Sequence, residues 1–106
     1  VHEGPQSISK FNSIKIEKGM ILSNEPGYYK KNHFGIRIEN LVYVNKSKNK
    51  LFFDNLTFAP LETDLINYKL LDKTEKDYLF KYHLNIYSKY SSLLNKKERK
   101  WLANLI

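Results

Sequence analysis

Residues 20–44 have the sequence MILSNEPGYYKKNHFGIRIENLVYV, in which two apolar runs flank a polar, glycine-containing segment. The first run, residues 20–25, ends on a polar tip and is typical of a short strand. The second run, residues 36–44, is rich in β-branched and aromatic residues and is the clearest strand in the chain. Between them, residues 26–35 open with Pro-Gly and end at Gly35, which predicts a loop. We therefore expect two antiparallel strands that are joined by this loop.

The segments on either side extend the β region toward both ends of the chain. Residues 14–20, IKIEKGM, alternate in polarity and then reach Gly19, a pattern that predicts a strand followed by a turn. Residues 45–50, NKSKNK, are typical of a polar turn. The stretch LFFDNLTFAPL at 51–61 then supplies one or two further short strands.

The last third of the chain changes from strand-like alternation to helical spacing. Asp72 with Glu75 predicts a capping box at the start of a helix, and Asn95 with Glu98 repeats the device for a short final helix. In the first helix, apolar and aromatic residues recur at steps of three and four and predict one buried face: Leu79, Tyr82, Ile86, Tyr90 and Leu93. We therefore predict an α+β fold, antiparallel strands followed by two C-terminal helices.

Length and composition are those of one small domain. The chain has 106 residues, of which 42% are hydrophobic, so it can bury a core of modest size. It has no cysteine, which excludes a disulfide framework and a cysteine-based metal site. No apolar run approaches the roughly 18 residues that a membrane helix needs, and we expect no signal peptide. We expect a cytoplasmic protein without a membrane partner, and a sequence beginning at Val1 that is a piece of a longer one.

The net charge of +7 comes almost entirely from lysine, since Arg37 and Arg99 are the only arginines among 18 basic residues. A protein that binds nucleic acid is expected to use more arginine at base edges and phosphates. The lysines are spread along the chain, which favours a solvated surface and no nucleic-acid partner. A small basic nucleic-acid-binding domain is the alternative, and a steep salt dependence of DNA binding would support it.

Two glutamates, Glu25 and Glu39, stand inside the strand-like region. Glu39 shares a strand face with Arg37, because side chains alternate with period two, and Glu25 ends the preceding apolar strand. If the two strands pair through the intervening loop, both carboxylates reach one spot. Carboxylates bind cations at about 2.0–2.2 Å and can bridge two ions about 3.5–4 Å apart; His2 adds a nearby imidazole. From the residues alone, a surface charge pair, a loop carboxylate and a structural histidine are the alternative.

Four segments resemble, in order and in spacing, the C-terminal end of aminopeptidase P, the Xaa-Pro aminopeptidase branch of the pita-bread metallopeptidases. They are VHEGPQ (1–6), GMILSNEPGYY (19–29), FGIRIENLVYV (34–44) and LTFAPL (56–61). The EPG and RIEN motifs are shared with prolidase and related pita-bread enzymes, whereas VHEGP and the helical tail favour aminopeptidase P. The resemblance covers essentially the whole chain. It implies the C-terminal portion of a pita-bread catalytic domain over residues 1–71, followed by a helical extension over residues 72–106.

The resemblance also implies roles for individual residues. Glu25 matches a metal-ligating glutamate, and Glu39 matches a second glutamate that bridges two metal ions. His2 matches a histidine that contacts substrate and steadies the tetrahedral intermediate. Arg37 and Tyr29 match positions that brace a metal-binding aspartate. In the family, two divalent cations, commonly manganese with zinc or cobalt as alternatives, activate a water that attacks the Xaa-Pro peptide bond and releases the first residue.

The chain carries only part of the family's metal site. The resemblance implies five protein ligands, two aspartates, one histidine and two glutamates, of which this chain supplies the two glutamates. We therefore expect the C-terminal part of a catalytic domain that is inactive alone and acts with its upstream remainder, as a homodimer, on peptides with proline second. The alternatives are prolidase, which needs a dipeptide, methionine aminopeptidase, and a non-catalytic pita-bread module that binds peptide or histone.

Overall fold

The computed structural model describes residues 4–106, which divide into two compact units, the first ending at Thr57 and the second beginning at Phe58. The first unit holds the five described strands and the second holds the two described helices. This confirms the predicted α+β order of antiparallel strands followed by two helices. The predicted division of the chain between residues 71 and 72, into a catalytic part and an extension, stays a prediction.

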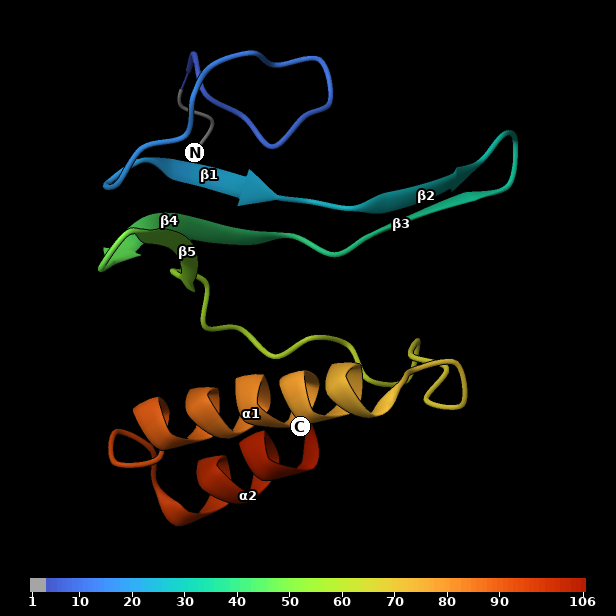
Figure 1. Cartoon of the computed structure of the whole chain (residues 1–106). Helices are drawn as coiled ribbons and strands as arrows, with labels where there is room; N and C mark the ends of the chain where they lie inside the picture. Colours follow the sequence, from blue (N-terminus) through green and yellow to red (C-terminus); the bar gives the residue numbers. More distant parts are fainter. Residues whose placement is uncertain (1–3) are drawn as a thin grey trace. The chain divides into compact units, whose positions relative to one another are not determined.

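The strands form two antiparallel sheets. A three-stranded sheet has the order β1-β4-β5, with β1 at Ile21–Asn24, β4 at Asn40–Ser47 and β5 at Lys50–Asn55. A two-stranded sheet pairs β2 (Gly27–Lys30) with β3 (Phe34–Arg37). Strand β1 leads into β2, and β3 leads back into β4, so both sheets are joined by one long hairpin (Figure 1).

The prediction of a loop at residues 26–35 is wrong for most of its length. Strands β2 and β3 pair along their full lengths, and the turn between them occupies only residues 31–33. In this turn Asn32 has a φ of 60°, a left-handed conformation that asparagine tolerates better than most residues. The Pro-Gly pair does not begin a loop. Pro26 instead lies where the hairpin ladder is interrupted, because it has no N–H to donate, and Gly27 begins β2.

The prediction of a single strand at residues 36–44 is also wrong, since β3 ends and β4 begins within it. Ile36 and Ile38 are each 46% exposed. Ile36 lies in the two-stranded sheet, where every residue is exposed, and Ile38 lies between β3 and β4. Only the part of the predicted strand that lies in β4 contributes to the core.

The core of the first unit lies on the three-stranded sheet. Its members come from β1, β4 and the segment before β1: Leu22, Val42, Val44, Ile16 and Met20. The strand predicted at residues 14–20 is wrong, because the first strand among the described residues is β1, which begins at Ile21. The predicted turn is confirmed, since Gly19 has a φ of 91° and its N–H donates to the carbonyl of Val44 at 2.8 Å.

The second unit is built on α1 (Lys73–Tyr90) and α2 (Lys96–Asn104), and both helices begin with the predicted capping boxes. Helix α1 buries Leu79, Tyr82, His83 and Ile86, and Ile86 has no exposed surface. Full burial of such a side chain stabilises a fold by about 1.5–3 kcal/mol. Tyr90 and Leu93, expected on the same face, are 39% and 77% exposed, because α1 ends at Tyr90.

Two side chains of α1 hold the segment that opens the second unit. Nε2 of His83 accepts a hydrogen bond from the backbone N–H of Leu61 at 3.2 Å, and the hydroxyl of Tyr82 donates to the carbonyl of Ala59 at 2.8 Å. Burial lowers the pKa of His83, which favours the neutral ring that can accept this bond. These contacts explain why the compact unit begins before the helices.

Candidate metal centre

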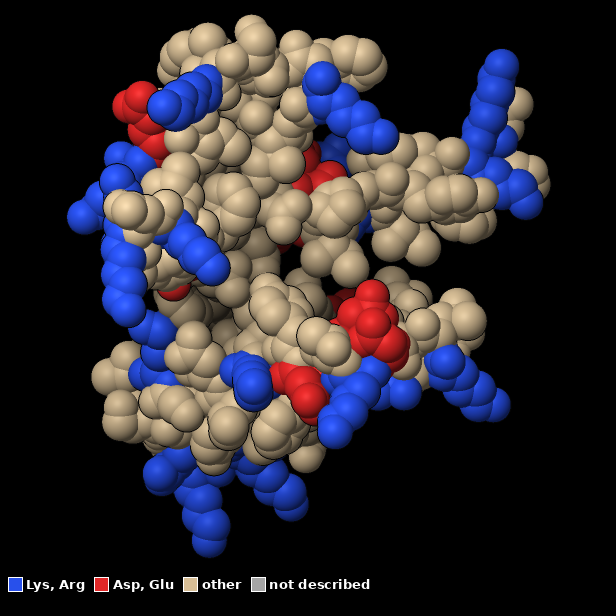
Figure 2. All heavy atoms as spheres, viewed as in Figure 1, with Lys and Arg blue, Asp and Glu red and all other residues tan. Residues whose placement is uncertain are grey.

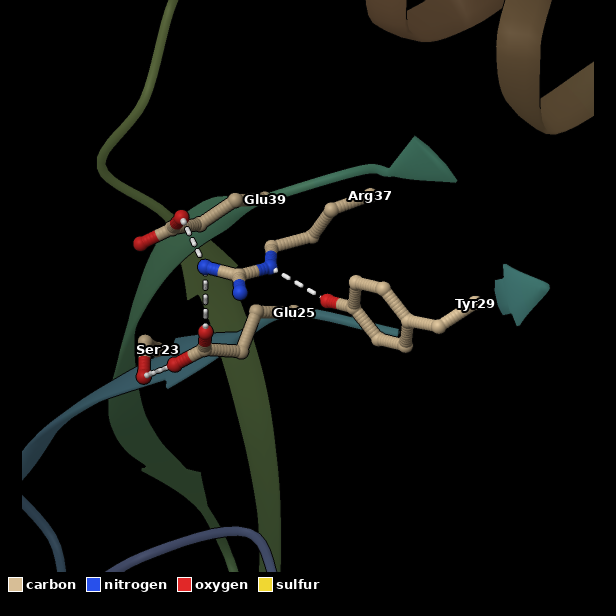
Figure 3. Close-up of polar contacts among 5 residues, drawn as sticks. All are labelled: Ser23, Glu25, Tyr29, Arg37 and Glu39. Carbon is tan, nitrogen blue, oxygen red and sulfur yellow. Dashed lines mark hydrogen bonds and ion pairs between the residues drawn. The ribbon is translucent and has the colours of Figure 1, made fainter. Parts of the chain in front are cut away.

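Glu25 and Glu39 lie across from each other where the long hairpin is interrupted (Figure 3). Strands β1 and β4 pair up to Asn24 and Asn40, and the ladder of β2 and β3 resumes in the same register on the far side of the interruption. Directly opposite residues in an antiparallel pair have Cβ atoms about 4.5–5.5 Å apart. The two carboxylates therefore face the same space, as the predicted metal site requires.

Two carboxylates in opposite positions repel each other unless a positive charge lies between them. Nη1 of Arg37 is 3.3 Å from Oε2 of Glu25 and 3.8 Å from Oε2 of Glu39. Figure 3 shows the guanidinium reaching between the two glutamates from the end of β3. The charge pair of Arg37 and Glu39, which the surface-pair alternative expects, is present, and a contact with Glu25 is added to it. The arrangement is thus suited to holding positive charge between two carboxylates.

Tyr29 contacts the Arg37 guanidinium at Nε, whereas the two glutamates contact it at Nη1. Nε of Arg37 donates a hydrogen bond to the hydroxyl of Tyr29 at 2.9 Å. This hydrogen bond and the electrostatic interaction with Tyr29, with smaller contributions from the charges of Glu25 and Glu39, raise the pKa of Arg37, so the side chain stays a cation. The planar guanidinium can contact the tyrosine with Nε and the carboxylates with Nη1 at the same time, whereas a lysine ammonium lacks this geometry. The structure therefore brings together four of the five predicted site residues.

Sequence reasoning missed Ser23, which orients one of these carboxylates. Its hydroxyl donates to Oε1 of Glu25 at 2.7 Å, while Oε2 of the same glutamate faces Arg37. The period-two alternation of a strand places residues 23 and 25 on one face, and this rule would have been enough to find the contact. Ligating carboxylates are themselves usually hydrogen-bonded in this way.

Glu25 lines a cavity, but the described residues do not complete a metal site there. A cavity of about 240 Å³ is lined by Ile8, Ser23, Asn24, Glu25 and Pro26. Carboxylate oxygens are ligands that manganese and zinc both accept. Within residues 4–106, however, no group of three or more acidic, histidine or cysteine side chains gathers to hold a metal. The predicted His2 lies outside the described residues, so Glu25 and Glu39 are the predicted ligands that the structure describes.

The charged surface is not concentrated at this site. Figure 2 shows lysine and arginine side chains spread over the visible face, among uncharged and acidic residues. Neither helix in the described part of the chain is long and apolar enough to cross a membrane.

Comparison with known proteins gives two family matches that together cover most of the chain. The model of metallopeptidase family M24 matches residues 1–46, and the model of the C-terminal region of peptidase M24 matches residues 49–105. These two matches cover the glutamates as well as both helices.

Several proteins are similar to this chain over nearly its whole length. Aminopeptidase P2 of Arabidopsis thaliana is 44% identical over 98% of the chain and 16% of its own length. Xaa-Pro aminopeptidase 1 of Dictyostelium discoideum is 42% identical over 100% of the chain and 19% of its own length. The crystal structure of the X-prolyl aminopeptidase from Caenorhabditis elegans, described as a cytosolic enzyme with a di-nuclear active site, matches with a TM-score of 0.84. The C. elegans protein is 34% identical to this chain, and the match covers 99% of this chain and 19% of the C. elegans chain. The chain thus spans less than a fifth of the length of these relatives.

Proposed function

This chain belongs to metallopeptidase family M24, and from that premise we propose that it is the C-terminal part of the catalytic domain of a metal-dependent Xaa-Pro aminopeptidase. The observation that carries the proposal is the placement of Glu25 and Glu39 opposite each other around the guanidinium of Arg37. The relatives that cover almost the whole chain bear the names of aminopeptidase P and Xaa-Pro aminopeptidase, which supports this substrate class over prolidase.

In this proposal Glu25 would hold one divalent ion and Glu39 would serve as a ligand to two, with manganese as the first candidate and zinc or cobalt as alternatives. When bound, the ions would supply an activated water and electrostatic stabilisation of the substrate carbonyl. Ser23 keeps Oε1 of Glu25 engaged and so limits the rotation of that carboxylate. His2 contacts the substrate and donates a hydrogen bond to the oxygen that becomes negative.

Arg37 and Tyr29 orient ligands in this proposal and do not bind metal themselves. The Tyr29 hydroxyl accepts a hydrogen bond from Nε of Arg37. Because the guanidinium is planar, this bond also orients its two Nη atoms. We propose that Arg37 presents these N–H groups to a metal-binding aspartate from the upstream part of the domain, in the bidentate geometry that guanidinium and carboxylate favour.

We extend the proposal to the wider setting of the enzyme. We propose that it acts on peptides of three or more residues with proline second, after the two aspartates and the histidine of the upstream part complete the site. We also propose a homodimer in the cytoplasm, and the cytosolic description of the C. elegans relative supports the location. Residues 72–106 form a helical extension of the catalytic domain in this proposal.

A substrate test distinguishes this function from those of related enzymes. The full-length enzyme with manganese should release the first residue of a tripeptide or longer peptide that has proline second. The same peptide with alanine second should remain intact, and release should be followed by chromatography of both products. Cleavage of Xaa-Pro dipeptides alone would assign the chain to a prolidase, and no cleavage of either substrate would reject the proposed reaction.

Replacing Arg37 by lysine should lower the turnover number by about 10–100-fold, the usual cost of losing an outer partner of a metal site. The melting temperature should change little, because the Arg37 side chain is 49% exposed and exposed ion pairs contribute little to stability. Kinetics and thermal unfolding of the full-length enzyme measure both. Near-normal turnover together with a large fall in melting temperature would show that Arg37 is structural instead.

A further inference from the structure

One face of the β2–β3 hairpin carries the side chain of Tyr29, that of Arg37, and two glycines. Gly35 pairs directly with Tyr29, and Gly27 pairs directly with Arg37. Because side chains alternate along a strand, these four residues point to the same face. The two large side chains therefore each stand opposite a residue without a Cβ atom.

The backbone does not require glycine at either position. Among the described residues Gly19 is the only glycine with a positive φ, so Gly27 and Gly35 adopt conformations open to other residues. Glycine inside a strand weakens it and often marks a place where another group approaches the backbone closely. The reason for these two glycines must then lie in the space above them.

That space is filled by the ring of Tyr29. A Cβ atom at Gly35 would lie 2.7 Å from Cδ1 and 3.1 Å from Cε1 of the ring. A Cβ atom at Gly27 would lie 2.6 Å from the hydroxyl oxygen and 2.8 Å from Cζ. The ring thus lies along the hairpin with its base over Gly35 and its hydroxyl over Gly27. In this position its oxygen accepts the 2.9 Å hydrogen bond from Nε of Arg37.

We propose that Gly27 and Gly35 are positioning residues for the metal centre, because they form the surface on which the Tyr29 ring must lie to hold Arg37. This inference rests on the proposed function, since Arg37 contacts the two carboxylates assigned to metal binding. A methyl group at either glycine displaces the ring. Tyr29 is 61% exposed, so the displaced ring can swing into solvent without disturbing a core. The fold is kept, while the hydrogen bond to Arg37 is lost.

A double-mutant cycle on the full-length enzyme tests this role. Gly35→Ala should lower the turnover number by about 10–100-fold, as expected when an outer partner of a metal site is lost. The melting temperature should stay close to that of the wild type. Tyr29→Ala should lower the turnover number by a similar factor, and adding Gly35→Ala to it should cause no further loss, because the ring that the methyl group displaces is already absent.

Gly19→Ala is the matched control, because it also adds one methyl group to a glycine of the first unit. A Cβ atom at Gly19 meets nothing within 4 Å, but its φ of 91° disfavours any other residue. This variant should lower the melting temperature and leave the turnover number of the folded enzyme unchanged. It separates a general loss of stability from the loss of activity expected at Gly35.

Two results would overturn the positioning role. One is a wild-type turnover number for Gly35→Ala. The other is that Gly35→Ala lowers the turnover number by the same factor whether or not the Tyr29 ring is present. If Gly35→Ala does not fold, restoration of a folded enzyme by Tyr29→Ala supports the proposed packing, and failure to restore it refutes that packing. Wild-type activity is measured first. Its absence counts against the proposed function, whereas normal wild-type activity with an unaffected Gly35→Ala counts against the positioning role alone.

Discussion

Glu25→Gln and Glu39→Gln should each reduce the turnover number of the full-length enzyme by more than the roughly 100-fold that loss of an outer partner can cost. Glutamine keeps the size of the side chain but removes the negative charge that binds a divalent ion. The fold of the metal-free enzyme should be little affected. Removing one of two carboxylates that face the same space relieves their repulsion and offsets the lost contact with Arg37.

Glu17→Gln provides the control for this pair of variants, because Glu17 is an exposed glutamate of the same unit that lies outside the candidate site. Its turnover number should equal that of the wild type. Kinetics with a proline-second peptide and thermal unfolding of the metal-free enzymes compare all four proteins. Normal activity in both Glu25→Gln and Glu39→Gln would show that these residues form a surface charge cluster and do not bind metal.

The isolated 106-residue chain should show no hydrolysis of a proline-second peptide above the rate of manganese alone. The reason is the donor set, since residues 4–106 bring no third acidic, histidine or cysteine side chain to Glu25 and Glu39. The assay is run beside the full-length enzyme under the same conditions. Circular dichroism of the isolated chain checks that α1 and α2 are formed. Hydrolysis within about tenfold of the full-length rate, close to 1.4 kcal/mol in barrier, would show that the ligand count is wrong.

Local patterns in the sequence predicted the features that depend only on neighbouring residues. Both capping boxes are confirmed, because a capping residue and its partner lie three positions apart and need nothing from the rest of the chain. The turn at Gly19 is confirmed for the same reason. The opposition of Glu25 and Glu39 follows from pairing two adjacent apolar runs, which is the simplest arrangement that a short connection allows.

The predictions that were wrong depend on what covers a strand. Ile36 and Ile38 have the same apolar character as Val42 and Val44, and only the partner strands decide which pair is buried. The Pro-Gly pair is typical of a turn, yet here Pro26 lies at an interruption of a hairpin that continues from Gly27. Periodicity alone carries no information on these two outcomes.

The parts of the site that sequence reasoning missed depend on side-chain space. Ser23 could have been found from strand alternation, but the choice among possible partners of its hydroxyl requires the position of Glu25. Gly27 and Gly35 look like turn residues in the sequence. Their proposed role becomes visible only once the ring of Tyr29 is placed over them.

The most direct test of the central claim is the number of metal ions bound by the full-length enzyme, measured by elemental analysis after dialysis against a low concentration of manganese. We predict two ions per chain in the wild type and in Glu17→Gln. We predict fewer in Glu25→Gln and in Glu39→Gln, with the larger loss at Glu39 because this residue is assigned to both ions. Full metal content in both site variants would contradict the assignment of Glu25 and Glu39 as metal ligands.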